Sequence, residues 1–345
     1  MAKKKTLTTA LRACVATGAF VAALAAFGPL AEAQTKGGNL IVAQSSNPPS
    51  LDAMVTSSQA SRNITMNIYE PLFGFDGNIR PIPILAEGVE ISPDGLKYRI
   101  TLRSGIKFHN GKVMTAEDVK ASLDRYIKHG ATQAMLKPVA SVDITGPLEV
   151  TLTLHAKTPT FLEAFSSPRA PAVIIPAEEA EKGPNEIAFI GTGPYKFVEY
   201  VPDSHVKLER FDDHVADTRH TAETGFGGNK MAWVDTVTFR IIPEAGAAVA
   251  ALETGEVHLL EQLPVPTARR LASNSDIAIY ENMPWAFLTF ILNLKEAPTD
   301  NPKVREAIQL AINNEEVMAI ATEGLFQLYH GWMYEGSTYD AGEIG

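Results

Sequence analysis

The stretch from residue 69 to 126 constrains the fold more than any other part of the chain, because it carries its own turn, strand and helix signals. Residues 92–95 read Ser-Pro-Asp-Gly, which is typical of a tight turn. From 97 to 103 apolar residues alternate with polar ones, the period of a half-buried strand. Gly105 and Gly111 each complete a turn pair beside a short apolar run, and this pattern predicts a hairpin.

A helix is predicted at the end of the same stretch. Thr115, with Asp118 three positions later, resembles a capping box with Asp in place of the usual Glu or Gln. Gly130 stands where a helix commonly stops at a glycine. Between these ends the apolar residues recur at helical spacing and are expected on one buried face: Val119, Leu123, Tyr126 and Ile127.

Further strand and helix signals follow along the rest of the chain. Residues 40–43 read as a buried strand and residues 56–68 as a helix. Residues 234–260 read as strand, helix and strand, a unit expected to be parallel and right-handed. The remaining expected elements are strands near 143–144, 150–154, 173–175 and 286–293, a hairpin over 195–211, and helices near 159–166, after Pro176 and from Pro302 toward Gly324.

The N-terminus has the pattern of an export signal. Three lysines and Arg12 precede an Ala-rich apolar run from about residue 13 to 30, and Ala31-Glu32-Ala33 fits the small-x-small cleavage rule. We expect cleavage between Ala33 and Gln34 and a periplasmic mature protein; an uncleaved membrane anchor is the alternative. Cys14, the only cysteine, lies within the signal, so neither a lipid anchor nor a disulfide is expected in the mature chain.

The charge balance is acidic. The chain has a formal net charge of −10, and loss of the leader, with four basic residues and one acidic residue, changes this to −13. An acidic exported protein is poorly suited to bind nucleic acid or an anionic membrane surface, so neither partner is expected.

Several separated segments resemble one protein family, both in their amino-acid sequence and in their order along the chain. They are YEPLF, SPDG.KYRITLR.GIKFHNG and TAEDVKASLDRY, followed by GTGPYKFVEYVPDSHVKLERFDDH, VDTVTFRIIPEAGAAVAALETGEVHLL and LNLKEAPTDNPKVREAIQLAINNEEV. The family is that of the periplasmic peptide and nickel substrate-binding proteins of ABC transporters, extracellular solute-binding family 5. The likeness extends over residues 40–325, and agreement in several places is far more specific than one match would be.

The resemblance implies a periplasmic binding protein-like α/β fold (class II, cluster C type) with two lobes and an extra domain. Residues 34–82 and 191–279 would form a discontinuous lobe I, residues 83–190 the extra domain, and residues 280–345 the start of lobe II. The chains of family members extend beyond the position that matches residue 345, and the last residues of this chain differ from the family's usual sequence. The last lobe is therefore expected to be incomplete and the chain a C-terminally truncated fragment.

Catalytic motifs are not found in the sequence. It contains no nucleophile elbow, no P-loop and no dinucleotide fingerprint after a strand, so no enzymatic activity and no cofactor are expected. Gly191-Thr192-Gly193 is interpreted as a tight turn rather than a phosphate loop, because Pro194 and a strand follow it. His109 is interpreted as structural.

One loop could hold a metal ion. Residues 212–220 contain two histidines and three aspartates, namely His214, His220, Asp212, Asp213 and Asp217. Nitrogen and oxygen donors of this kind suit zinc or nickel, but a spacing of six between the histidines matches no known ligand pattern. A solvated polar loop is the preferred interpretation, and no metal site is predicted.

Candidate ligand contacts come from the resemblance alone. They are Ser57 and Ser58 after the first strand, Arg169 near the place where nickel-type relatives have an arginine, and Trp285, Phe287 and Thr289 on a strand that lines the cavity in peptide-binding relatives. Each has a structural alternative: a helix cap for the serines, a surface ion pair for the arginine, and core packing for the aromatic residues. The resemblance places the arginine and aspartate that hold peptide termini in the part of the family expected to be missing here, so peptide specificity is not carried over.

The expected function is capture of an oligopeptide-like or dipeptide-like solute between two lobes, and its delivery to the permease and, through it, the ATPase of an ABC importer. The binding protein itself is expected to be monomeric. A nickel chelate, haem, an oligosaccharide or an opine is the alternative cargo for the same fold. A chaperone-like protein and an exported hydrolase are the alternatives from other classes.

Overall fold

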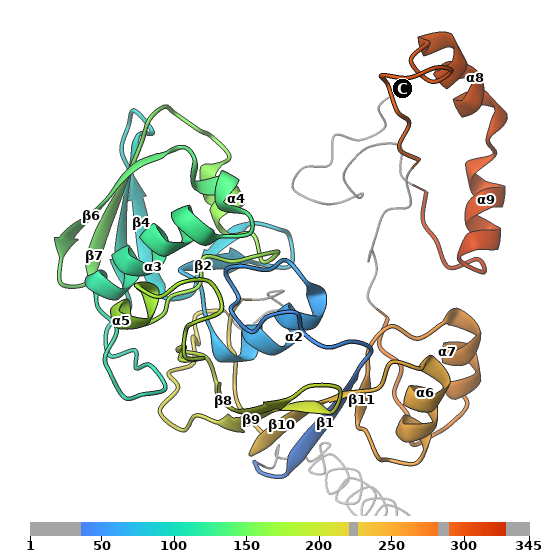
Figure 1. Cartoon of the computed structure of the whole chain (residues 1–345), viewed down its shortest axis with the longest axis horizontal. Helices are drawn as coiled ribbons and strands as arrows, with labels where there is room; N and C mark the ends of the chain where they lie inside the picture. The colour runs from blue at the N-terminus through green and yellow to red at the C-terminus, as the bar shows by residue number, and fades with distance from the viewer. Residues whose placement is uncertain (1–35, 221–226, 282–289, 329–345) are drawn as a thin grey trace, which may run out of the picture. The chain divides into compact units, whose positions relative to one another are not determined.

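The structure is a computed structural model that describes residues 36–220, 227–281 and 290–328. The chain divides into two compact units, Met1–Gly37 and Gly38–Gly345. Almost all of the first unit, including the expected leader, lies outside the described residues, as does half of the strand expected at 286–293. The other half, residues 290–293, is described and forms no strand. The description below concerns the second unit (Figure 1).

A five-stranded mixed sheet has the order β11-β1-β10-β9-β8. The second strand in this order, β1, runs parallel to both of its neighbours, whereas β9 is antiparallel to both β10 and β8. The strand–helix–strand unit predicted for 234–260 is therefore parallel, with β1 inserted between its two strands. The elements are β1 (Asn39–Gln44), β8 (Tyr195–Val201), β9 (His205–Arg210), β10 (Thr236–Ile241), α6 (Ala245–Glu253) and β11 (Leu259–Leu260).

A separate four-stranded antiparallel sheet has the order β4-β5-β7-β6. The alternation predicted for 97–103 is confirmed in β5, where Tyr98, Ile100 and Leu102 are buried and the residues between them are exposed. The strands are β4 (Ala86–Ile91), β5 (Lys97–Leu102), β6 (Val139–Gly146) and β7 (Glu149–Leu154), and helix α3 (Ala116–His129) packs against β6 and β7 (Figure 1).

Helix α3 begins where its capping box predicts, and the carboxylate of Asp118 accepts a hydrogen bond from the Thr115 amide at 2.9 Å. The predicted buried face is correct except for Ile127, which is 38% exposed because it lies at the margin of that face. Gly130 does end the helix but not in a left-handed conformation, since its φ is −61°. A glycine fits there because a Cβ atom would lie 2.8 Å from the Tyr126 ring.

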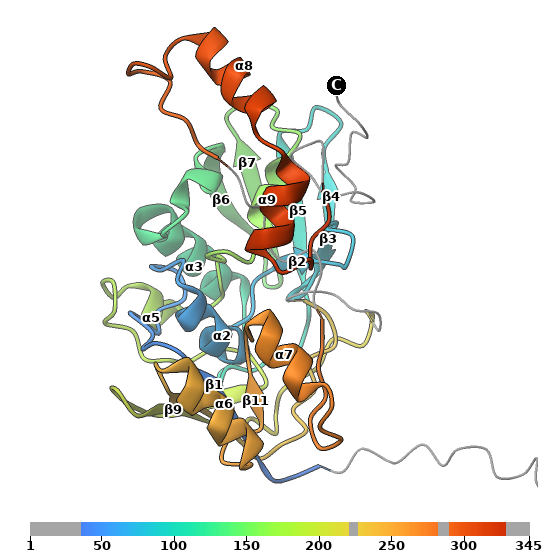
Figure 2. The same cartoon turned by 90° about the vertical axis from the view of Figure 1, so that its right-hand side faces the viewer.

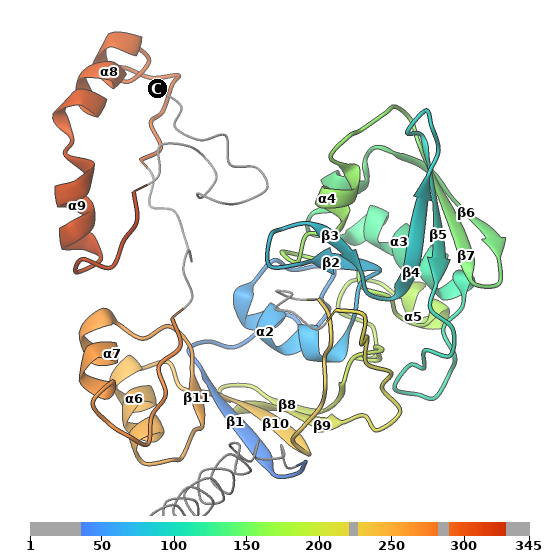
Figure 3. The ribbon, with the colours of Figure 1, turned by 180° about the vertical axis from the view of Figure 1, so that it is seen from behind.

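Helix α2 (Gln59–Ile68) lies between the five-stranded sheet and the short hairpin of β2 (Phe73–Phe75) and β3 (Pro81–Pro83), as Figure 3 shows. The helix starts three residues later than predicted. One hydrophobic cluster includes α2 residues such as Ile64 together with Ile100 of β5 and Phe239 of β10. The two sheets therefore share a continuous core, although the sequence assigns them to different domains.

The smaller elements agree less well with the predictions. The helices are η1 (Gln133–Leu136), α4 (Phe161–Phe165), α5 (Ala177–Ala180) and α7 (Val265–Leu271). The strand predicted at 173–175 is wrong: Val173 forms only an isolated bridge with Pro71, and the segment is buried by packing. The hairpin predicted around residues 106–113 is likewise reduced to a single bridge between Lys107 and Val113.

Two helices follow near the C-terminal end of the described residues, α8 (Pro302–Ala311) and α9 (Asn314–Ala321). Asn301 caps α8 as predicted, because its side chain accepts a hydrogen bond from the Lys303 amide at 3.0 Å. The single apolar stripe expected as far as Gly324 is interrupted, since Ile312 has extended backbone angles and ends α8. Neither helix contains a buried residue. No helix within the described ranges has the length and apolar character needed to cross a membrane.

Candidate functional site

The carboxyl ends of the parallel strands β1, β10 and β11 meet at one edge of the five-stranded sheet. In open α/β sheets, ligands bind outside the carboxyl ends of strands, so this edge is where a site is expected. The loop after β1 leads to the N-terminal end of α2, and the loop after β11 lies beside it (Figure 2). The two elements therefore present their polar residues together.

Ser57 and Ser58 lie at the start of α2, where the resemblance places ligand contacts. Ser57 is exposed and Ser58 is half-buried. The capping alternative is not borne out for Ser58, the N-cap residue, because its side chain makes no capping hydrogen bond. Its own amide donates instead to the Thr56 hydroxyl at 3.1 Å. Both residues thus lie beside the first turn of the helix and are at least partly exposed.

Glu261 follows β11 directly and fastens the adjoining loop to α2. One carboxylate oxygen accepts a hydrogen bond from the Gln59 side-chain amide at 3.0 Å, and the other accepts one from the Asn63 amide at 2.7 Å. Both donors lie on one face of the helix because they are four residues apart. This contact fixes an exposed carboxylate close to Arg62, whose pKa it acts to raise.

Arg169 is exposed and lies near α2. Its main-chain oxygen accepts a hydrogen bond from the Arg62 guanidinium at 3.3 Å. The surface ion pair that was its structural alternative is not found: within residues 36–220, 227–281 and 290–328, Arg169 pairs with no carboxylate. Partial burial and then the charge of Arg169 lower the pKa of Arg62, while Glu261 opposes this effect.

Three of the predicted contact residues, Trp285, Phe287 and Thr289, lie outside the described residues. Of the predicted set, the structure therefore brings Arg169 close to the helix that Ser57 and Ser58 begin. Arg62 and Glu261 were missed. A signal for Arg62 was present, because Gln59, Arg62 and Asn63 are spaced to share one polar face of a helix. Glu261 has no comparable signal, since only folding brings it to α2.

The turn at residues 191–193 has a structural role, as predicted. A Cβ atom at Gly191 would lie 2.1 Å from the Ile68 oxygen, and one at Gly193 would lie 2.5 Å from the Asn67 oxygen. The turn thus packs directly on the C-terminal end of α2. His109 joins it there, accepting a hydrogen bond from the Gly191 amide at 3.3 Å and donating one to the Gly193 oxygen at 2.9 Å. Its interpretation as a structural residue is confirmed.

A buried polar group lies under the same turn. One carboxylate oxygen of Glu70 accepts a hydrogen bond from Thr192 at 2.8 Å, and the other lies 3.5 Å from the ring of His214. Burial acts to raise the pKa of Glu70, but the bond to His214 and the positive charge of Lys230 outweigh it, so this pKa is lowered. These side chains hold the two ends of the 83–190 segment together.

The interpretation of residues 212–220 as a solvated loop is wrong for two of its members. Asp217 is 4% exposed and pairs with Arg219 at 2.7 Å, and the side chain of His214 is 6% exposed against Glu70. Asp213 pairs with Lys107 and Asp212 with Arg210. Because the donors point to different partners, they do not converge, and the described residues contain no group of three metal-ligating side chains.

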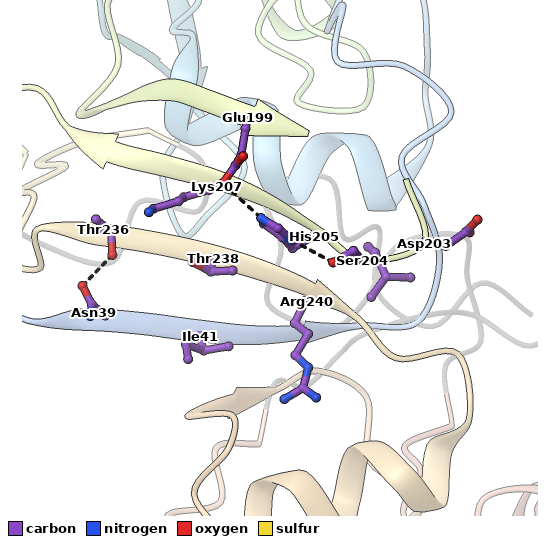
Figure 4. Close-up of a pocket in the computed structure, with 11 residues that line it drawn as sticks. Asn39, Ile41, Glu199, Asp203, Ser204, His205, Lys207, Thr236, Thr238 and Arg240 are labelled. Atoms are coloured by element: carbon purple, nitrogen blue, oxygen red, sulfur yellow. Dashed lines mark hydrogen bonds and ion pairs between the residues drawn. The ribbon is translucent and has the colours of Figure 1, made fainter. Parts of the chain in front are cut away.

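A hollow of about 640 Å³ lies on the five-stranded sheet, away from the predicted contacts (Figure 4). Its lining residues alternate along β9 and β10 with the core residues Val206, Leu208, Val237 and Phe239, so it opens on the face opposite the core. His205 pairs there with Glu199 at 3.2 Å, and Arg240 pairs with Glu256 at 3.0 Å. Paired charges and threonines are typical of a solvent-facing sheet surface, and none of the predicted site residues lies here.

Comparison with known proteins agrees with this architecture. The family described as bacterial extracellular solute-binding proteins, family 5 Middle, matches residues 80–344. The glutathione-binding protein GsiB of Salmonella paratyphi A is 31% identical over 83% of this chain and 54% of its own length. The chain thus spans about half the length of the curated relatives it matches.

Two solved structures show the same fold. The oligopeptide-binding protein AppA of Bacillus subtilis, in complex with a nonapeptide, has a TM-score of 0.66 at 25% identity, over 84% of this chain and 57% of that one. NikA of Brucella suis, in complex with Fe(III)-EDTA, has a TM-score of 0.73 at 24% identity, over 87% of this chain and 59% of that one. The predicted α/β fold of the periplasmic binding protein type is confirmed, and the chain belongs to the bacterial extracellular solute-binding proteins of family 5.

Proposed function

We propose that this chain is the solute-capturing component of an ABC importer and that its solute is peptide-like. The observation that carries the proposal is the exposed polar surface at the carboxyl edge of β1 and β11, formed by the start of α2, Arg169 and Glu261. Placed polar groups of this kind orient a small ligand, whereas catalysis would need a nucleophile beside a base. The chain captures its solute and does not transform it.

The peptide-like character of the solute is supported by the relatives. GsiB is named for glutathione, a tripeptide, and AppA was solved with a nonapeptide. In this proposal Ser57, Ser58 and Arg169 contribute hydroxyl and guanidinium groups to the solute site, and Trp285, Phe287 and Thr289 contribute aromatic and hydroxyl groups. The permease and ATPase of the importer are the proposed partners of the loaded protein.

The proposed domain limits fall between the two sheets. Residues 34–82 and 191–279, which include the five-stranded sheet, form lobe I, and residues 83–190, which include the four-stranded sheet, form the extra domain. Residues from 280 onward begin lobe II.

The protein acts in the periplasm after cleavage between Ala33 and Gln34. Amino-terminal sequencing of exported material tests this cleavage site, and a mature chain that retains Lys3 contradicts it.

The experiment that tests the function is a binding titration. Glutathione, a nonapeptide and a nickel–histidine chelate are each added to the purified chain in a calorimeter. We expect saturable binding of at least one peptide and no chemical change in the recovered ligand. Binding of the nickel chelate alone would replace the peptide assignment, and hydrolysis of a peptide would overturn the binding-protein assignment.

A further inference from the structure

A hydrogen-bonded chain of three side chains lies in the hollow on the five-stranded sheet (Figure 4). The Ser204 hydroxyl lies 2.9 Å from Nδ1 of His205, and Nε2 of the same ring lies 3.2 Å from a carboxylate oxygen of Glu199. A hydroxyl group beside a base whose other nitrogen is held by a third group is the arrangement that activates a nucleophile. The solute surface proposed above uses none of these three residues.

The proton positions in this chain follow from the carboxylate. An ionised Glu199 can only accept a hydrogen bond, so Nε2 of His205 carries the proton of that bond. In the neutral ring Nδ1 is then unprotonated, and it accepts a hydrogen bond from the Ser204 hydroxyl. The imidazole is therefore oriented as a general base toward Ser204, which is exposed and lines the hollow.

The turn between β8 and β9 holds Ser204 beside His205. The Ser204 amide donates a hydrogen bond to the Val201 oxygen at 3.1 Å, which closes the turn. Asp203 has a φ of 60°, a left-handed conformation that costs energy for a residue other than glycine. Asn47 holds it there, because its side-chain oxygen accepts a hydrogen bond from the Asp203 amide at 2.9 Å. The position of the serine is thus fixed by the turn as well as by its bond to the histidine.

We propose that Ser204, His205 and Glu199 form a nucleophilic site that takes the acyl group of small activated esters, such as aryl esters or thioesters. The Ser204 oxygen attacks the carbonyl carbon and forms the new bond, while its proton passes to Nδ1 of His205. The bond to the leaving phenolate or thiolate breaks, and that group takes the proton from His205. Water then attacks the acyl group, its proton returns through Nδ1 to the Ser204 oxygen, and the carboxylic acid leaves. Glu199 acts through His205 as a positioning residue.

This activity goes beyond solute capture, because the hollow lies on the other face of the sheet. Leu40 and Val42 of β1 pack against the main hydrophobic cluster, which includes α2 residues, whereas Ile41 lines the hollow. Charged intermediates are weakly stabilised in a solvent-facing hollow, so the ester must bring a good leaving group. Peptide amides lack one and are not cleaved at this site.

The first test is acetylation by p-nitrophenyl acetate at pH 8, followed by mass spectrometry of the tryptic peptide that spans residues 197–207. We expect an acetyl group on Ser204, formed about 100-fold faster than on Ser273, which is the lower end of what a positioned general base contributes. Ser273 is the matched comparison within the same chain: it is exposed, but its hydroxyl donates to the main-chain oxygen of Arg270 at 2.8 Å. Equal acetylation of the two serines overturns the inference.

The second test measures the release of p-nitrophenolate by variants. Ser204→Ala lacks the nucleophile, and His205→Asn can hold a hydrogen bond to Ser204 but cannot take its proton; we expect both to fall about tenfold or more below the parent rate. Glu199→Gln should lower the maximal rate about tenfold at an unchanged half-saturating ester concentration, and Glu199→Asp should retain part of that rate. Circular dichroism spectra like that of the parent chain establish that the variants are folded. A parent-like rate in Ser204→Ala overturns the site, and a parent-like maximal rate in Glu199→Gln overturns its positioning role.

Calorimetry with glutathione and the nonapeptide separates this inference from solute capture. Ser204→Ala should bind these peptides as the parent chain does. Loss of peptide binding in that variant would place the hollow within the solute site and overturn the separate activity. Acetylation of Ser204 in a chain that binds no peptide would support the activity and contradict the proposed solute.

Discussion

His109 shows how a single residue ties two distant segments together in this protein. Its ring accepts a hydrogen bond from the Gly191 amide through Nδ1 and donates one to the Gly193 oxygen through Nε2. This arrangement needs a neutral ring with its proton on Nε2, since a proton on Nδ1 would break the first bond. Burial lowers the pKa of His109 to about 4, against an ordinary value of 6.5, and the bond to Gly193 offsets only part of this effect.

We therefore predict that folding stability falls as the pH decreases from about 6.5 toward 4. In that window the unfolded chain binds a proton on His109 and the folded chain does not, so acid favours unfolding. Between pH 7 and pH 5 this residue should account for about 2 kcal/mol of lost unfolding free energy. The measurement is urea unfolding at both pH values for the parent and for His109→Asn, whose amide can make both hydrogen bonds without titrating. An equal pH dependence in the two proteins would contradict the prediction.

At the scale of elements, helix α3 is fastened to the loop after β1 by a fully buried ion pair. Arg125 lies 2.5 Å from Asp52, and neither side chain is exposed to solvent. The remaining polar atoms are also satisfied: Arg125 donates to the Gly183 oxygen at 3.1 Å, and Asp52 accepts from the Asn185 amide at 3.2 Å. The pair joins the 83–190 segment to the edge of the five-stranded sheet.

Removing one member of this pair should be strongly destabilising. Arg125→Met leaves the Asp52 carboxylate buried without a cation, and we expect a loss of about 3–5 kcal/mol in unfolding free energy. The double variant with Asp52→Asn should recover part of that loss, because it no longer buries an unpaired charge. The control is Lys120→Ala, which breaks an exposed pair with Asp124 at 2.8 Å on the same helix and should cost less than about 0.5 kcal/mol. Urea titration measures all three, and a loss below 1 kcal/mol for Arg125→Met would refute this account.

At the scale of the whole molecule, burial is distributed unevenly along the chain. The main hydrophobic cluster takes residues from Leu51 to Phe239 and includes both sheets. In contrast, no residue of α8 or α9 is buried, and Leu310 and Ile320 are 81% and 76% exposed. Because tertiary packing supplies most of the stability of short helices, α8 and α9 should be the least protected of the described helices.

Limited proteolysis should reveal this difference. We expect trypsin to cut first after Lys295, Lys303 or Arg305, and to spare Arg103 and Arg125 until the sheets unfold. Mass spectrometry of timed samples identifies the order of cleavage. Early cleavage within residues 97–154 would show that the four-stranded sheet is not the protected part of the chain.

The sequence by itself determined the features that depend on nearby residues. The alternation in β5, the capping of α3 by Asp118 and of α8 by Asn301, and the parallel unit over 234–260 were all predicted, because period and capping act within a few residues. Sequence similarity over many separated segments also predicted the family, and the comparisons confirm it.

Only the tertiary structure decided the features that join distant segments. Val173 was predicted as a strand from its apolar run, but it is buried by packing and has a single bridge partner. His214 and Asp217 appeared in the sequence to lie in a solvated loop, yet they are turned inward by Glu70 and Arg219. Glu261 reaches α2 across 202 positions of sequence from Gln59. No local pattern encodes such contacts, because burial and charge pairing depend on which surfaces the completed fold brings together.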